Sequence, residues 1–120
     1  MKKVVIVEDN QVIQHMFKSW FANDEFNVQF LDNIDNLVEK IEEIKPDLIV
    51  TDIMLPDSTA ADLITTYSKV KYPVIVLSSM DEEDVEFFAE KIGAIKSFTK
   101  PVNMPEIYGF INDYFLHVEN

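Results

Sequence analysis

Short runs of wholly apolar residues alternate along this chain with segments in which apolar residues recur every three or four positions. The runs cover residues 4–7, 48–50 and 74–77, and none contains a polar break. Such runs are typical of strands that are covered on both faces, as in parallel sheets. The segments between them have the spacing of amphipathic helices. The alternation predicts an α/β fold with a doubly wound parallel sheet and helices on both faces.

Five strands and five helices are expected. The run 27–31 alternates in polarity, which indicates a strand near an edge of the sheet. Asn10 or Asp9 is expected to cap the first helix, and Ser58 or Asp57 the third. The expected strands are residues 4–7, 27–31, 48–50, 74–77 and 94–99, and the expected helices are residues 11–22, 37–44, 60–67, 81–90 and 104–117.

The length and composition suit one domain. A chain of 120 residues with 48% hydrophobic side chains can bury one two-sided core, so we expect a single domain over residues 1–120. With 22 acidic and 10 basic residues the net charge is -12, which disfavours direct binding to nucleic acid or to an anionic membrane. The absence of cysteine excludes disulfides and thiolate metal sites. The apolar run 4–7 is too short for a signal sequence or a membrane span, so a cytoplasmic location is expected.

Polar side chains follow four of the expected strands. Glu8 and Asp9 come after the first strand, Asp52 after the third, Ser78 after the fourth and Lys100 after the fifth. Open α/β sheets bind their ligands at the carboxyl ends of the strands, where these groups would converge. Crowded carboxylates repel one another unless a cation lies among them. Mg2+ takes carboxylate and carbonyl oxygens, so the sequence predicts a magnesium site.

The same cluster is suited to a phosphoryl group. The ammonium of Lys100, the hydroxyl of Ser78 and a bound dication together match the oxygens of a phosphoryl group. Asp52 would then act as a nucleophile, because a carboxylate forms an acyl phosphate when the phosphoryl group is held in line and its charge is neutralised. No general base is needed, since a carboxylate is ionised at neutral pH.

Four motifs follow the expected strands: Glu8-Asp9 after the first strand, Asp52 in Asp-Ile-Met-Leu-Pro-Asp, Ser78 after Pro-Val-Ile-Val-Leu, and Lys100-Pro101 after Gly93-Ala94. In their order and spacing they together resemble the receiver domain of two-component response regulators. The resemblance covers essentially all 120 residues. It implies a flavodoxin-like sheet of five parallel strands in the order 2-1-3-4-5. No output domain is expected within these residues, so the chain would be a stand-alone regulator, a phosphorelay shuttle or the excised amino-terminal domain of a longer regulator.

The resemblance implies a role for each acidic residue. Asp52 would accept a phosphoryl group from a phosphohistidine of a sensor histidine kinase or a histidine phosphotransfer protein. Mg2+ would be bound directly by Asp9 and Asp52, and by Glu8 largely through water. The backbone carbonyl of Met54 would complete the ligands that the chain supplies.

The resemblance also implies how the signal leaves the site. Lys100 would contact the phosphoryl oxygens, and the Ser78 hydroxyl would turn inward to bond the phosphoryl group and draw its loop along. Pro101 would follow a cis peptide bond. The chain would be a signalling phosphoacceptor and not an enzyme. Its phosphorylation would shift an equilibrium between two conformations, and a downstream effector protein would recognise one of them.

Two positions depart from the family pattern. Ser97 stands where the family usually has Tyr or Phe as a rotating switch residue, and the neighbouring Phe98 has the character of a buried strand residue. The aromatic half of the switch is therefore missing from its usual position. Ala60 replaces a usual Gly, which indicates a turn without a positive φ angle.

The residues two positions beyond Asp52 and Ser78 are both methionines, Met54 and Met80. They would flank the approach of a hydrolytic water molecule. Because thioethers order water poorly, we expect slow self-dephosphorylation.

The last helix carries more aromatic residues than one buried stripe can use. We therefore expect a surface there for a homodimer or another partner. His15 and His117 fall on helices far along the chain from the acidic cluster, and we interpret them as surface or interface residues.

The sequence argues against three alternatives, of which the first is the main competitor. A pseudo-receiver would keep the fold as a binding module without phosphotransfer, although its hallmark is the loss of Asp52 or Lys100, and both are present. A hydrolase of the haloacid-dehalogenase type would need a second acid where Met54 stands. A flavodoxin-like electron carrier would need a phosphate-cradling loop where Glu8-Asp9 stands.

Overall fold

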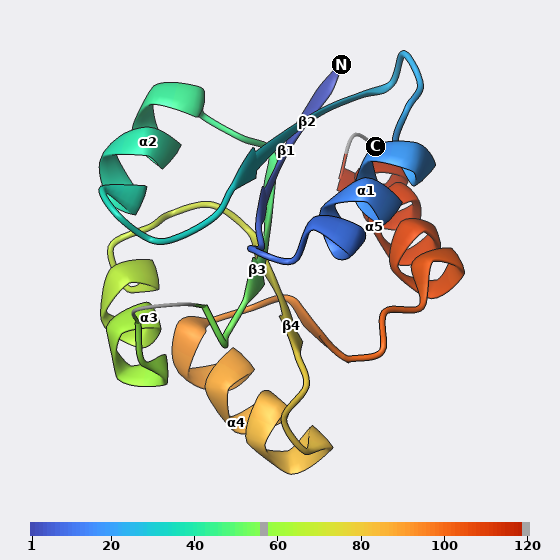
Figure 1. Ribbon diagram of the computed structural model, residues 1–120. Coiled ribbons are helices and arrows are strands. Elements are labelled where there is room, and N and C mark those ends of the chain that lie inside the picture. Colours follow the sequence, from blue (N-terminus) through green and yellow to red (C-terminus); the bar gives the residue numbers. More distant parts are fainter. Residues whose placement is uncertain (56–57, 119–120) are drawn as a thin grey trace.

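The computed structural model describes residues 1–55 and 58–118. All neighbouring strands pair in parallel, in the order β2-β1-β3-β4-β5 (Figure 1). The expected doubly wound sheet and its strand order are confirmed. The strands are β1 Lys2–Val7, β2 Phe26–Leu31, β3 Leu48–Asp52, β4 Val74–Ser78 and β5 Lys96–Thr99, and the helices are α1 Gln11–Trp20, α2 Leu37–Ile44, α3 Ala60–Tyr67, α4 Glu82–Ile92 and α5 Met104–Val118.

Two separate cores lie on the two faces of the sheet. Val4 and Ile6 of β1 face the core under α1 and α5, whereas Val5 and Val7 face the core under α2, α3 and α4 (Figure 1). Because successive strand residues point to opposite faces, a strand between two helical layers must be apolar at every position. This requirement explains the unbroken runs in β1, β3 and β4. The edge strand β2 is only half-buried after Phe26, as its alternating sequence predicts.

The first helix begins as expected. The side-chain oxygen of Asn10 accepts a hydrogen bond from the backbone N–H of Ile13 at 3.1 Å. Of the two residues expected to cap this helix, Asn10 is therefore the cap. The cap also places the loop between β1 and α1, which contains Glu8 and Asp9, directly beside the start of the helix.

The expected cap of the third helix is wrong. Thr59, and not Ser58, caps α3: its hydroxyl accepts from the N–H of Asp62 at 3.1 Å, and the Asp62 carboxylate accepts from the N–H of Thr59 at 2.9 Å. In this reciprocal capping box an acid stands three residues after the cap, and Asp62 stands three residues after Thr59. The Ser58 hydroxyl instead donates to the carbonyl of Leu55 at 3.2 Å. Asp57, the other expected cap, lies outside the described residues.

The boundary between α4 and β5 differs from the expected one. Helix α4 continues to Ile92 and ends at Gly93, whose φ angle is 81°. The N–H groups of Gly93 and Ala94 both donate to the carbonyl of Ala89. Because residues 93–94 complete the helix end, β5 starts only at Lys96.

Positive φ angles among the described non-glycine residues occur at Asn36 and Lys45. Ala60 is the first residue of α3, so its expected turn without a positive φ angle is confirmed.

The aromatic residues of α5 pack largely against the molecule itself. Tyr108, Phe110 and Tyr114 are half-buried against the core that α1 covers. The ring of Tyr108 lies 5.7 Å from that of Trp20 and 5.0 Å from that of Phe21. Helix α1 and the residue that follows it therefore cover much of the aromatic surface of α5 that exceeds one buried stripe. Within residues 1–55 and 58–118, no helix is long and apolar enough to cross a membrane.

Candidate functional site

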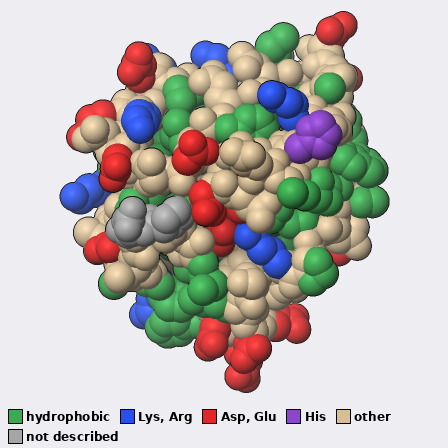
Figure 2. Space-filling view, viewed as in Figure 1, with side chains coloured by type: hydrophobic (Ala, Val, Ile, Leu, Met, Phe, Trp, Pro, Cys, Tyr) green, Lys and Arg blue, Asp and Glu red, His purple; other side chains and the backbone are tan. Residues whose placement is uncertain are grey.

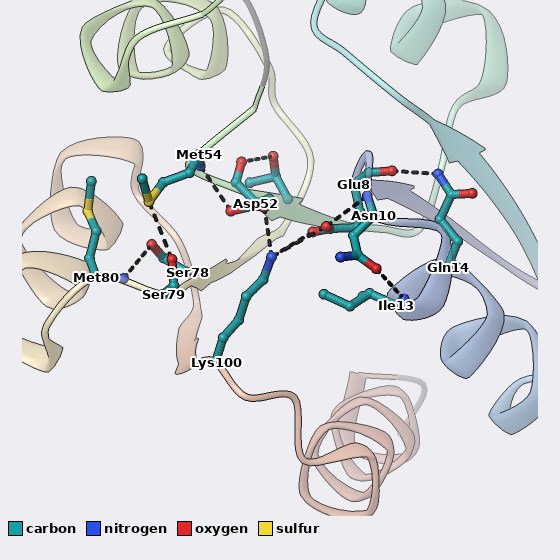
Figure 3. Close-up of polar contacts among 11 residues, drawn as sticks. Glu8, Asn10, Ile13, Gln14, Asp52, Met54, Ser78, Ser79, Met80 and Lys100 are labelled. Atoms are coloured by element: carbon teal, nitrogen blue, oxygen red, sulfur yellow. Dashed lines mark hydrogen bonds and ion pairs between the residues drawn. The ribbon is translucent and has the colours of Figure 1, made fainter.

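Four strands deliver polar side chains to one edge of the sheet. Asp52 is the last residue of β3 and Ser78 the last of β4, while Glu8 directly follows β1 and Lys100 directly follows β5. Figure 3 shows Lys100 reaching from its strand end toward Asp52 and Glu8. Parallel pairing of the four strands places these ends together, although Glu8 and Lys100 lie 92 positions apart in the chain.

Lys100 forms ion pairs with two buried carboxylates. Its Nζ lies 2.8 Å from Oδ2 of Asp52 and 3.3 Å from both side-chain oxygens of Glu8. Glu8 is fully buried and Asp52 is 3% exposed. Two carboxylates thus share one ammonium in a region that water barely reaches. The pair of acids carries one negative charge more than the lysine can balance.

Burial and the neighbouring charges shift the pKa values of Glu8 and Lys100. Burial, together with the charge of Asp52, raises the pKa of Glu8 to about 7, although the charge of Lys100 acts in the opposite direction. Burial also lowers the pKa of Lys100, but the hydrogen bond to Asp52 and the charges of both acids outweigh it and raise that pKa above its ordinary value. The lysine therefore stays charged at neutral pH. A further cation near Glu8 would be favourable.

Three acids could hold such a cation. Glu8, Asp9 and Asp52 each offer a carboxylate oxygen, and these oxygens lie within 4.8 Å of one another. Glu8 and Asp52 are buried, and Asp9 is exposed. An all-oxygen set with one solvent-facing member suits Mg2+, which binds carboxylates and keeps several waters. The donor atoms present therefore fit the magnesium ion that the sequence predicts.

The loop after β3 is tied to Asp52. The backbone N–H of Met54 donates to Oδ1 of Asp52 at 2.9 Å. With Oδ2 bound to Lys100, both oxygens of Asp52 are oriented by hydrogen bonds. The same bond keeps the backbone of Met54 next to the acidic cluster.

The loop after β4 is tied to itself and to Met54. The buried Ser78 hydroxyl accepts from the N–H of Met80 at 3.1 Å, and the Ser78 carbonyl accepts from the N–H of Lys100 at 2.7 Å. The Ser79 hydroxyl donates to Sδ of Met54 at 3.4 Å (Figure 3). A turn of the Ser78 hydroxyl toward Asp52 would therefore break its bond to Met80.

Sequence reasoning missed Gln14. Its Nε2 donates to the backbone carbonyl of Glu8 at 2.6 Å and to Oδ1 of Asp32 at 2.8 Å. The backbone N–H of Asn10 also donates to the Glu8 carboxylate at 3.2 Å. The two bonds to Glu8 hold the loop that carries Glu8 and Asp9. No sequence signal points to Gln14, because its partners include a backbone carbonyl, which every residue has.

The remaining residues singled out in the sequence lie outside the cluster. Ser97 is half-buried on β5 and lines a hollow of about 390 Å³ between α4 and α5, while Phe98 is buried at 7% exposure. His15 and His117 are exposed on α1 and α5. The peptide bond between Lys100 and Pro101 is cis.

The surface around the site is mixed in character. Figure 2 shows acidic side chains beside a lysine near the centre of this face, with hydrophobic side chains gathered close to them. The site therefore has a charged part and an adjoining apolar part.

Two kinds of sequence comparison point to one family. The model of the response regulator receiver domain matches residues 4–112. The transcriptional regulatory protein KdpE of Staphylococcus aureus is 35% identical over 106 residues, which are 88% of this chain and 46% of that protein. The alkaline phosphatase synthesis transcriptional regulatory protein PhoP of Bacillus subtilis is 28% identical over 108 residues, which are 88% of this chain and 45% of that protein. The chain spans about half the length of these curated relatives.

Solved structures share the fold. The receiver domain of the TMAO respiratory system response regulator TorR has a TM-score of 0.83 at 23% identity, with 98% of both chains covered. A two-component response regulator from Clostridium difficile has a TM-score of 0.87 at 17% identity, with 100% of both chains covered. With this fold, an acidic cluster at the expected strand ends and a family match over residues 4–112, the chain belongs to the response regulator receiver domain family of two-component systems.

Proposed function

We propose that this chain is a phosphoacceptor in which Asp52 receives a phosphoryl group from a phosphohistidine of a sensor histidine kinase or a histidine phosphotransfer protein. The observation that carries the proposal is the ammonium of Lys100 between Asp52 and Glu8 in a cluster of three acids. A nucleophilic carboxylate, a site for a dication and a lysine are the groups that phosphoryl transfer to an aspartate requires. The chain is thus a signalling protein and not an enzyme with turnover.

Each residue has a distinct part in the transfer. Glu8, Asp9, Asp52 and the carbonyl of Met54 would hold Mg2+, which when bound would offset the charge of the phosphoryl oxygens. The Met54 N–H donates to Oδ1 of Asp52 and so orients the carboxylate that would attack the phosphorus atom. Lys100 already lies 2.8 Å from Oδ2, so its ammonium is in place to follow the incoming phosphoryl oxygens.

Ser78 would transmit the phosphorylation of Asp52 to the loop before α4. In the proposal its hydroxyl leaves the N–H of Met80 and donates to a phosphoryl oxygen, so the loop before α4 moves with it. A downstream effector that binds the moved loop better than the original one shifts the equilibrium further. Ser97 cannot act as an aromatic switch, and in the proposal the parts that move are the Ser78 loop, α4 and β5.

The proposal extends to location and assembly. A cytoplasmic location fits partners such as a sensor kinase and an effector, and two relatives are named transcriptional regulatory proteins. Leu116 and Val118 at the end of α5 are 55% and 61% exposed, which supports a homodimer or partner contact through the last helix. The competing function is that of a pseudo-receiver, which binds partners without taking up phosphate.

A phosphorylation assay separates the two functions. We expect Mg2+ and acetyl phosphate to add one phosphoryl group to the chain, measured by intact-mass spectrometry, and we expect EDTA to prevent the addition. Mg2+ alone should raise the melting temperature, because a ligand that binds only the folded state stabilises it. The gain in unfolding free energy is about 2.7 kcal/mol when Mg2+ is present at a hundredfold excess over its Kd. A chain that takes up no phosphoryl group is a pseudo-receiver. A chain that takes it up equally well in EDTA is phosphorylated at another residue.

We further infer that the acyl phosphate is long-lived. The thioethers of Met54 and Met80 are weak hydrogen-bond acceptors and would order a hydrolytic water poorly, whereas an amide at position 54 would hold it with stronger hydrogen bonds. Met54→Asn should therefore shorten the half-life of the phosphorylated chain by about tenfold, the effect of one added hydrogen bond in the transition state. The half-life is measured by intact mass after the donor is removed. A wild-type half-life no longer than that of the variant would contradict the inference.

A further inference from the structure

Gln14 on α1 bonds two loops that start from neighbouring strands. Its Nε2 donates to the backbone carbonyl of Glu8 at 2.6 Å and to Oδ1 of Asp32 at 2.8 Å. Glu8 directly follows β1, and Asp32 directly follows β2. A side-chain amide nitrogen carries two N–H groups, so Gln14 has one donor for each loop. The side chain therefore joins both loops to the first helix.

This bridge lies where the pairing of β1 with β2 ends. The last paired residues are Val7 and Leu31, and the N–H of Glu8 donates to the carbonyl of Leu31 at 3.0 Å. Both strands end there, and the bonds of Gln14 connect the two loops one residue further on. Figure 3 shows the Gln14 amide turned toward Glu8. The bridge thus extends the connection between the two strands up to the acidic cluster.

The carbonyl of Glu8 influences where Asp9 lies. Its carbon atom is bonded to the nitrogen of Asp9 and the peptide unit is planar, so the bond from Gln14 sets the plane in which Asp9 begins. On the other side, Asn10 is held as the cap of α1, and its N–H donates to the Glu8 carboxylate at 3.2 Å. Asp9 therefore stands between two anchored residues.

Asp9 depends on this backbone more than the other two acids do. Lys100 forms ion pairs with the carboxylates of Glu8 and Asp52, and both of these acids are buried. Asp9 is exposed, yet one of its oxygens lies within 4.8 Å of an oxygen of each of the other acids. Groups that orient metal ligands from outside the coordination shell commonly decide how tightly the ion binds. A loss of the bridge would therefore reach the metal site mainly through Asp9.

We propose that Gln14 is a positioning residue for the metal site, where it raises the affinity for Mg2+ by fixing the peptide bond between Glu8 and Asp9. The inference rests on the proposed function and adds to it a residue that touches neither the dication nor the phosphoryl group. Gln14 contributes no charge to the site, so its effect on Mg2+ is geometric. The Asp32 carboxylate, on the other loop, holds the Gln14 amide in the direction that the Glu8 carbonyl requires.

Gln14→Met tests the proposal, because methionine keeps the length and helix preference of glutamine and has no side-chain N–H to donate. We expect the Kd for Mg2+ to rise by about tenfold, the lower end of the effect of removing a group that orients a metal ligand. The Kd is measured without a phosphodonor, from the dependence of the urea-unfolding free energy on Mg2+ concentration. With saturating Mg2+ the variant should still take up one phosphoryl group at close to the wild-type rate, since Asp52 and Lys100 are unchanged.

Two further variants serve as the control and the second test. Gln11→Met is the matched control, because Gln11 is an exposed glutamine on the same helix, and its Kd should equal that of the wild type. Gln14→Asn keeps the amide on a side chain one methylene shorter, which cannot reach both acceptors from the same backbone position. Its Kd should therefore rise as well.

The outcomes separate a positioning role from a structural one. If Gln14 only stabilises the fold, Gln14→Met should lower the unfolding free energy equally in EDTA and in Mg2+ and leave the Kd at its wild-type value. That result would overturn the inference while the proposed function stands. An equal rise in Kd for Gln11→Met would also overturn it. If the wild type takes up no phosphoryl group from acetyl phosphate with Mg2+, the proposed function fails instead, whatever the Kd values are.

Discussion

Asp52→Asn is expected to abolish Mg2+-dependent phosphorylation while the chain stays folded. The amide has nearly the shape of the carboxylate, and its oxygen can still accept the hydrogen bond from the N–H of Met54. It lacks the negative charge that makes the oxygen a nucleophile, and it removes one of the acids that would hold the dication. Loss of both contributions should lower the rate by about a thousandfold or more, below detection in an intact-mass assay.

The experiment needs evidence that the variant is folded and a second aspartate for comparison. Urea unfolding should show a cooperative transition for Asp52→Asn. Asp84→Asn changes an exposed aspartate in the first turn of α4 and should be phosphorylated like the wild type. Continued uptake of one phosphoryl group by Asp52→Asn would place the acceptor on another residue and would refute the assignment.

The sequence predicts the sheet well because its strands are buried on both faces. In β1, β3 and β4 the apolar runs are explained by burial on both faces of the sheet. The existence, type and approximate ends of these three strands therefore follow from the sequence. The boundary between α4 and β5 is less predictable. The end of α4 uses the N–H groups of Gly93 and Ala94, and residues 94–95 are apolar enough to be mistaken for strand.

The candidate site also has a part that the sequence predicts and a part that it does not. Charged residues at the ends of parallel strands identify Glu8, Asp52 and Lys100, because topology alone brings those ends together. Contacts within a loop do not follow from topology. The bonds of Gln14 to the Glu8 carbonyl and of Ser79 to the sulfur of Met54 depend on the path of each loop, which no residue type dictates.

Lys100→Met is expected to lower the rate of phosphoryl transfer by about a hundredfold or more. Methionine is apolar and close in length to the lysine stem, so the substitution removes little besides the ammonium. That ammonium lies 2.8 Å from the attacking carboxylate, where it would stabilise the charge on the transferring phosphoryl group. Loss of one such preorganised group typically costs a factor of about 10² to 10³. Initial rates with acetyl phosphate and Mg2+ measure the effect, and Lys69→Met, at an exposed position, should leave them unchanged.

The same variant separates the role of the lysine from that of the metal site. In metal-free buffer it leaves the buried Glu8 and Asp52 without their cation, and the loss of one partner of a buried ion pair costs about 3–5 kcal/mol of unfolding free energy. Mg2+ supplies positive charge to the same two acids, so it should stabilise Lys100→Met by more than it stabilises the wild type. Urea unfolding with EDTA and with saturating Mg2+ tests this difference. Transfer at the wild-type rate, or an equal response of both proteins to Mg2+, would show that the ammonium and the dication do not act on the same carboxylates.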